Sequence, residues 1–165
     1  MRRWPENPAP VCGGTEVHGR RLLVADTSLT LELARVVAYE TGLAVHLTLT
    51  TTAGSARRAQ HQTRFLTDPR DTSARWSYLD IWFGTTDHDL AVADPYRMRP
   101  DLEASAAAIC TYRTEPQYWI GTDTDDAPVR SLTLTAEWRH IGLKPTTATL
   151  ALDHVDDRRT RRARR

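Results

Sequence analysis

The part of the chain from residue 131 to residue 153 carries the strongest pattern in the sequence, SLTLTAEWRHIGLKPTTATLALD. In its first half Leu132, Leu134 and Trp138 alternate with polar residues, and a second alternation begins at Thr147. Successive side chains of a strand point to opposite faces of a sheet, so a period of two is typical of a strand with one buried face. The pattern therefore predicts two strands, each with an apolar face toward a core and a polar face toward water.

A turn is expected between these two strands. Gly142 and Pro145 lie between the two alternating runs, and neither residue suits a strand interior. The two strands then form a final hairpin. Trp138 shares a face with Leu132 and Leu134, so we predict that it is buried and structural.

Shorter alternating or apolar runs predict the other strands, at residues 20–26, 28–41, 42–52, 76–83 and 118–120. Residues 28–41 also fit a helix that stops before Gly42. The following run, GLAVHLTLTTT, alternates cleanly, so we favour a hairpin with a turn at residues 40–42. Residues 53–75 are polar and are interpreted as either mobile or hiding a short helix. Residues 85–100 are expected to form a loop, and residues 101–110 a short helix with Asp101 as its N-cap.

These elements predict an all-β fold, an antiparallel β-sandwich (immunoglobulin-like) of about seven strands, with at most a short helix near residues 101–110. A half-open barrel is the alternative. A chain of 165 residues suits one domain. We expect an irregular, Pro- and Gly-containing leader over residues 1–17, a single sandwich domain over 18–155, and a disordered Arg-rich tail over 156–165.

The order of four sequence blocks supports this fold by resemblance. VVAYETGLAVHLTL, WSYLDIWFG, QYWIG and SLTLTAEWRHIGLKPTTATLAL resemble, in this order, a family of actinobacterial β-sandwich proteins with no assigned activity. The final hairpin of that family carries a Glu-Trp pair and then a Gly-Leu or Gly-Ile turn, here Glu137, Trp138, Gly142 and Leu143. The resemblance covers residues 22–153 and implies a sandwich, but it implies no reaction and no ligand.

The net charge of +1 is unevenly distributed. The last residues carry six arginines, and removing them leaves +1 less six, or −5, for the rest of the chain. Arg-rich segments neutralise phosphates, so nucleic acid is a possible partner through this tail only. The alternative is a solubilising tail, or one that folds back on the acidic body. The tail arginines are Arg158, Arg159, Arg161, Arg162, Arg164 and Arg165.

Other sequence features indicate a cytoplasmic protein. No apolar run approaches the roughly 20 residues that span a bilayer, so no membrane association is expected. The N-terminal residues have a charged start without an apolar stretch behind it, which excludes a secretory signal. Without export, Cys12 and Cys110 are expected to be reduced thiols. No cofactor is expected.

The predicted strand at residues 76–83, WSYLDIWF, carries the candidate binding residues. Both of its faces are rich in apolar side chains. Leu79, Ile81 and Phe83 make the better core face, because they have no polar atoms that need partners. The outer face then holds the candidate binding residues, Trp76, Tyr78, Asp80 and Trp82. Either a segment of this chain covers these aromatic residues or a partner does, because such rows rarely stay exposed on a monomer.

Catalytic and metal signatures are weak. The six histidines are scattered, and no nucleophile motif or phosphate-binding Gly-rich loop is present. Asp123, Asp125 and Asp126 form a weak calcium candidate in one loop, with solvated turn aspartates as the alternative. We therefore expect a non-enzymatic protein that binds another protein or assembles with itself. A small-molecule or carbohydrate-binding module is the alternative, and an enzyme comes third.

Overall fold

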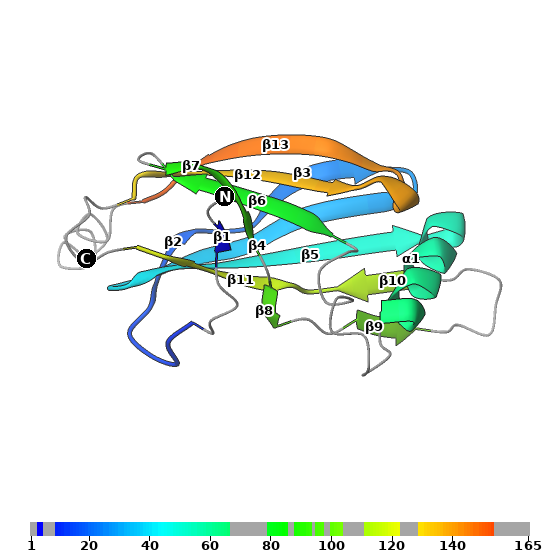
Figure 1. Cartoon of the computed structure of the whole chain (residues 1–165), viewed down its shortest axis with the longest axis horizontal. Coiled ribbons are helices and arrows are strands. Elements are labelled where there is room, and N and C mark those ends of the chain that lie inside the picture. Colours follow the sequence, from blue (N-terminus) through cyan, green and yellow to red (C-terminus); the bar gives the residue numbers. More distant parts are fainter. Residues whose placement is uncertain are drawn as a thin grey trace, which may run out of the picture.

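The computed structural model describes residues 3–4, 9–66, 79–85, 88–93, 95–97, 100–103, 111–122 and 129–153. Two mainly antiparallel sheets pack face to face (Figure 1). The final hairpin lies in one layer, and the long hairpin of β4 (Leu29–Tyr39) and β5 (Gly42–Thr52) lies in the other. The predicted all-β antiparallel sandwich is confirmed.

The first layer is a five-stranded sheet. In it β12 (Ser131–Trp138) is hydrogen-bonded to β6 (Asp80–Thr85) on one side and to β13 (Leu143–Ala151) on the other. Neighbouring strands of this sheet are antiparallel, except that β1 and β7 run parallel to each other. In spatial order the strands are β1 (Arg3–Trp4), β7 (His88–Ala93), β6 (Asp80–Thr85), β12 (Ser131–Trp138) and β13 (Leu143–Ala151).

The second layer is an eight-stranded sheet built around β4 and β5, whose hairpin is its longest ladder. One edge of β4 pairs with β2 and β3, and the free edge of β5 pairs with β10 and β11. Its strands are β2 (Thr15–His18), β3 (Arg21–Asp26), β4 (Leu29–Tyr39), β5 (Gly42–Thr52), β8 (Pro95–Arg97), β9 (Pro100–Glu103), β10 (Thr111–Thr114) and β11 (Gln117–Gly121).

The core between the layers follows from the alternation in each strand, since every second side chain of β5 and β12 is buried. Two aromatic contacts cross from one sheet to the other. Phe83 packs edge-on against Tyr118 with ring centroids 5.4 Å apart, and Tyr112 packs edge-on against Trp138 at 6.1 Å. Edge-to-face geometry is the favourable arrangement of ring quadrupoles, so these pairs fix how the layers stack.

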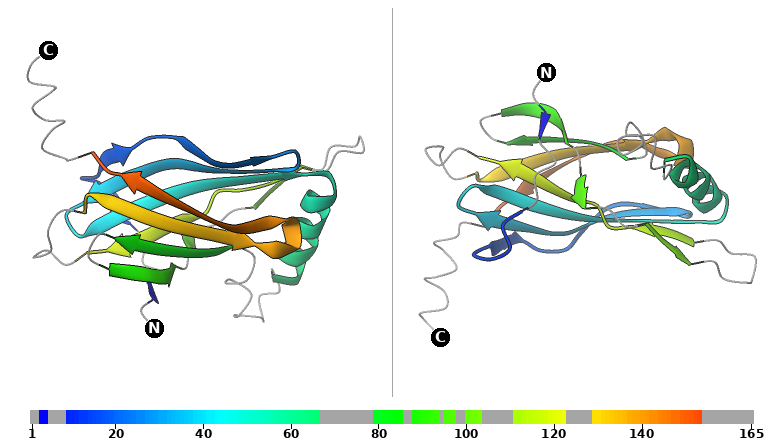
Figure 2. Two further views of the ribbon diagram at one scale, coloured as in Figure 1. Left: turned by 90° about the horizontal axis from the view of Figure 1, so that it is seen from above. Right: turned by 60° about the horizontal axis from the view of Figure 1, so that its bottom comes forward.

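One helix, α1 (Ala53–Leu66), closes an end of the sandwich beside the turn of the final hairpin (Figure 2). The side of the helix that contacts the sandwich carries small residues, and Ala56 and Ala59 are buried there. Gln62 accepts a hydrogen bond from the Nε1–H of Trp138, and this bond ties the helix to the opposite layer. Of the two interpretations of residues 53–75, the helix is the one observed over residues 53–66.

The strongest sequence predictions are confirmed. The final hairpin is present, and Trp138 is only 2% exposed. Its turn is the short 3₁₀ segment η2 (Arg139–Ile141) followed by Gly142, whose φ of 94° favours glycine. Residues 28–41 form a strand that pairs with residues 42–52, as the hairpin interpretation requires. Strands are also present at residues 21–26 and 117–121.

Some predicted strand ends were wrong, because hydrogen bonding to a neighbouring strand decides where a strand ends. The strand predicted at residues 76–83 is observed from Asp80 to Thr85, so Gly84 lies inside β6, where it is paired with Thr133 of β12. Pro145 lies inside β13 rather than ending it. The β12–β13 register shifts between Ala136 and Trp138, so Pro145 has no registered partner there. A bulge on an edge strand is a place where proline costs no ladder bond.

The strand count was too low, since the described residues form thirteen strands rather than about seven. The expected loop at residues 85–100 instead contains β7 and β8 and ends at β9, and β10 was not predicted. The short helix near residues 101–110 is wrong at residues 101–103, which pair with β10, while 104–110 lie outside the described residues. Within the expected irregular leader, β1 and β2 are strands. All these segments are short or polar, and pairing with a neighbour overrides their weak local preference.

Candidate functional site

The structure divides the predicted binding strand as expected. Ile81 and Phe83 point into the core and are at most 1% exposed, and Leu79 is also buried. Asp80 and Trp82 therefore lie on the outer face of β6. Trp76 and Tyr78 lie outside the described residues, so the predicted row of aromatic residues is placed only at Trp82.

Trp82 is half-buried between two neighbours on the same outer face. It lies in register with Thr135 of β12 on one side and with Val92 of β7 on the other. Leu90, two residues before Val92 in β7, is 47% exposed. Trp82, Val92 and Leu90 therefore form a small apolar patch on the outer surface of β6 and β7.

Threonine pairs continue this face across the final hairpin. The hydroxyl groups of Thr133 and Thr149 are 3.2 Å apart, and those of Thr135 and Thr147 are 2.8 Å apart. Each pair is in register across the ladder. None of these four threonines carries a charge, and their hydroxyl groups bond to one another. The guanidinium of Arg21 reaches the edge of this surface, where it donates a hydrogen bond to the carbonyl oxygen of Thr149 at 3.2 Å. Paired threonines also stabilise the hairpin, typically by a few tenths of a kcal/mol or more.

We call this surface the uncharged face. It contains the outward residues of β7, β6, β12 and β13 between the two ends of the sheet. In the left view of Figure 2 this layer lies in front, and none of the other described elements covers it. Its residues are Trp82, Leu90, Val92, Ser131, Thr133, Thr135, Thr147, Thr149 and Ala151.

Two carboxylates border the uncharged face at one end. Asp80 and Glu137 lie opposite one another in register, and Arg139 pairs with Glu137. Partial burial, and then the neighbouring Glu137 carboxylate, raise the pKa of Asp80 above its ordinary value. Like charges placed opposite each other on a sheet are unfavourable, so this end of the face carries an incompletely neutralised negative charge.

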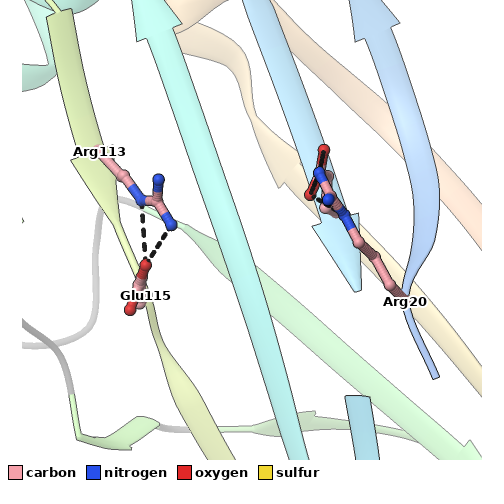
Figure 3. A network of polar contacts seen from close by, with 4 residues as sticks. Arg20, Arg113 and Glu115 are labelled. Carbon is pink, nitrogen blue, oxygen red and sulfur yellow. Dashed lines mark hydrogen bonds and ion pairs between the residues drawn. The ribbon is translucent and has the colours of Figure 1, made fainter. Parts of the chain in front are cut away.

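The outer face of the other sheet has a contrasting character, because ion pairs cross it. Arg20 donates two hydrogen bonds to Glu32, at 2.9 and 2.8 Å, and Arg113 donates two to one oxygen of Glu115. Figure 3 shows the two pairs on either side of β5. The hydrogen bonds from Arg20 lower the pKa of Glu32, and Arg113 adds a smaller effect.

His46 lies on the same charged face, in register with Arg35 and Gln117. Burial, and then the positive charge of Arg35, lower the pKa of His46 below its ordinary value. In the alternation of β5, His46 lies on the outward face, between the buried Val45 and Leu47. The two outer surfaces of the sandwich therefore differ: ion pairs cross one, and on the other the charged side chains lie at its border.

The uncharged face was missed as a unit at the sequence level. The alternation of the last hairpin predicts a polar outward side for each strand, but it does not predict that these sides join into one surface with Trp82. The available signal was the repeated Thr-x-Thr spacing, Thr133 and Thr135 on one strand and Thr147 and Thr149 on the next. Which of them lie opposite Trp82 depends on β6–β12 pairing, which the spacing alone does not determine.

The remaining candidates are not placed. Asp123, Asp125 and Asp126 lie outside the described residues, as do the tail arginines. Among the residues that are described, no three His, Cys, Asp or Glu side chains cluster in a way that could hold a metal ion. No helix in the same part of the chain is long and apolar enough to cross a membrane.

Comparisons with protein-family models, curated proteins and solved structures give no match to this chain. The site is therefore argued from its geometry.

Proposed function

We propose that this chain is a non-enzymatic β-sandwich protein that binds another protein through the uncharged face. The observation that carries the proposal is the absence of charge across this face, as defined by its described residues, in a chain of which 26% is charged. Interface cores are depleted of charged residues and enriched in aromatic ones. Trp82 supplies the aromatic anchor. The threonine pairs supply a surface with a small desolvation penalty on binding, because their hydroxyl groups already have hydrogen-bond partners.

The neighbouring features fit the same role. Aromatic anchors near the centre of an interface carry much of its binding energy, and a polar rim surrounds them. Here the rim is the Asp80–Glu137 end, with Arg139 beside it. The charged outer face of the other sheet is a poorer interface core, because binding there would have to desolvate its ion pairs.

The carbohydrate-binding alternative has less support. Sugar binding would need an exposed aromatic ring for stacking, and one aromatic pair among the described residues of the eight-stranded sheet is Tyr39 with Trp119. Trp119 is only 7% exposed, so its ring offers no open stacking surface.

The test uses a matched pair of charge insertions. The purified chain is used to capture a partner from a lysate of the native host, and the partner is identified, purified and titrated against variants. Thr149→Arg puts a charge on the uncharged face, and Thr50→Arg puts the same charge on the outer face of the other sheet. We expect Thr149→Arg to weaken binding about tenfold or more, because it buries an unpaired charge, and Thr50→Arg to leave it unchanged. Equal affinities for the two variants would refute the proposal.

A further inference from the structure

A groove of about 630 Å³ lies at the end of the β4–β5 hairpin, in the eight-stranded sheet rather than in the sheet that carries the uncharged face. Tyr39, Glu40 and Thr41 form one wall, and the segment that contains Cys12 and Thr15 forms the other. The second wall is held by β2, whose Thr15 pairs with Ala38 of β4. A volume in this range is typical of sites for small ligands.

Glycine allows the two walls to meet. A Cβ atom at Gly14 would lie 2.5 Å from the Cγ1 of Val37 and 2.6 Å from the Cζ of Tyr39, which is closer than real contacts allow. Gly13 has a φ of 85°, in the region that favours glycine. The two consecutive glycines therefore let the N-terminal segment turn and lie directly against the hairpin.

The hairpin wall is fixed from behind. Tyr39 packs edge-on against Trp119 with centroids 5.7 Å apart, and the amide of Thr122 donates to the carbonyl oxygen of Thr41 at 3.0 Å. This wall of the groove is thus held by a backbone hydrogen bond and by a ring whose orientation is set by a buried neighbour. A preformed site loses less conformational entropy on binding than a site that must order itself.

The charge of the groove selects its ligand. Among the described residues that line it, Glu40 is the single charged side chain, and it is exposed. The other polar groups are hydroxyls and a thiol, and Tyr39 adds an aromatic ring. A carboxylate beside an aromatic ring is a favourable setting for an organic cation, through a charge-assisted hydrogen bond and a cation–π contact.

We infer that this groove binds a small organic cation, an amine carried on an apolar or aromatic body. The amine lies against Glu40, and the body of the ligand occupies the space between Tyr39 and the segment that contains Cys12. This site is separate from the uncharged face, so it extends the function proposed above.

The test uses two probes that differ only in charge. Tyramine carries an ammonium group, and tyrosol carries a neutral hydroxyl group in its place. Binding of each is followed on the full chain by calorimetry and by backbone amide chemical shifts. We expect tyramine to bind with a Kd of about 1 mM or lower, with shifts around residues 10–15 and 38–41, and tyrosol to bind at least about threefold more weakly.

Two carboxylate variants identify the site. Glu40→Gln should lower the affinity for tyramine about threefold to tenfold, the range expected for a partly exposed ion pair. Glu16→Gln is the matched control, since Glu16 is an exposed carboxylate on β2 that does not line the groove. Both variants should melt at the temperature of the parent chain. Undetectable tyramine binding, equal binding of tyrosol, or an equal loss in Glu16→Gln would each overturn the inference.

Discussion

Trp82 of β6 lies directly opposite Thr135 of β12 on the outer surface of the five-stranded sheet. The hydroxyl group of Thr135 bonds in turn to that of Thr147, so an indole, two threonines and their neighbours form one continuous surface without charge. The register of three strands creates this surface, and the proposed function depends on it.

Replacing Trp138 should be costly, because its side chain connects the five-stranded sheet to the other layer and to α1. Its ring meets Tyr112 across the core, and its Nε1–H donates to Gln62 of α1. Trp138→Ala leaves a cavity, and we expect it to lower the free energy of unfolding by about 3–5 kcal/mol. Chemical denaturation measures this directly. Trp138→Phe keeps a ring and should cost less, and a loss below about 1 kcal/mol for the alanine variant would show that the cavity account is wrong.

Gly42 is expected to tolerate no side chain. A Cβ atom there would lie 2.3 Å from the carbonyl oxygen of Ile120 and 2.8 Å from the Cζ2 of Trp119. Gly42→Ala must push β11 away from the hairpin, so we expect a loss of about 1–3 kcal/mol, in the range of overpacked sites. Gly54→Ala is the control, because it meets nothing within 4 Å and lies in α1. Its expected effect in thermal melts is neutral or stabilising.

Asp80 should make the protein less stable when it is ionised. Its pKa is raised in the folded state by partial burial and by Glu137, so the folded state holds the proton more tightly than the unfolded chain. The stability that protonated Asp80 contributes is therefore lost as the pH rises from the ordinary pKa of this carboxyl group, 3.8, through its pKa in the folded state. We expect Asp80→Asn to be more stable than the parent at pH 7, with the difference shrinking in acid.

Asp26 is the matched contrast for this experiment. Hydrogen bonds from the amide and hydroxyl groups of Thr27 lower the pKa of Asp26. The stability that ionised Asp26 contributes is present at pH values above its ordinary pKa of 3.8, and it is lost as the pH falls through the pKa of the folded state. Asp26→Asn should therefore be less stable than the parent at pH 7. Melting curves in which both variants shift in the same direction at pH 7 would contradict this assignment of causes.

His46 should weaken the fold in mild acid. Burial and Arg35 lower its pKa, so the unfolded chain takes up a proton before the folded state does. Stability from this group is present above the ordinary value of 6.5 and falls as the pH drops from there through the folded pKa. We expect His46→Gln to show a flatter dependence of unfolding free energy on pH below 6.5. An unchanged slope would mean that another group titrates there.

The sequence predicted those parts of the fold where alternation is strong. The β4–β5 and β12–β13 hairpins have long runs of Leu and Val against Thr, and their inward residues, such as Leu47 and Leu134, are buried. It failed at β7 and β10. The inward residues of β7 include Ala91, which gives little apolar signal, and β10 is a four-residue strand whose inward positions are Tyr112 and the polar Thr114. Such strands form because a neighbouring edge supplies their hydrogen bonds, and one segment read by itself does not reveal that neighbour.

The candidate sites show the same limit. Asp80 and Trp82 were assigned to the outer face from the period of two alone. The threonine partners of Trp82, and the groove beside Glu40, depend on contacts between segments far apart in the chain. Residues 10–15 were expected to be irregular, yet glycines in that segment allow it to form one wall of the groove.

Site-specific photo-crosslinking tests the central claim most directly. The photoreactive residue p-benzoylphenylalanine replaces Trp82 on the uncharged face, or Thr48 on the outer face of the other sheet, in chains expressed in the native host. The account predicts a discrete crosslinked protein from position 82 that disappears when Thr149→Arg is added, and no such product from position 48. No product at position 82, or the same product from both positions, would contradict the claim that the uncharged face binds a protein partner.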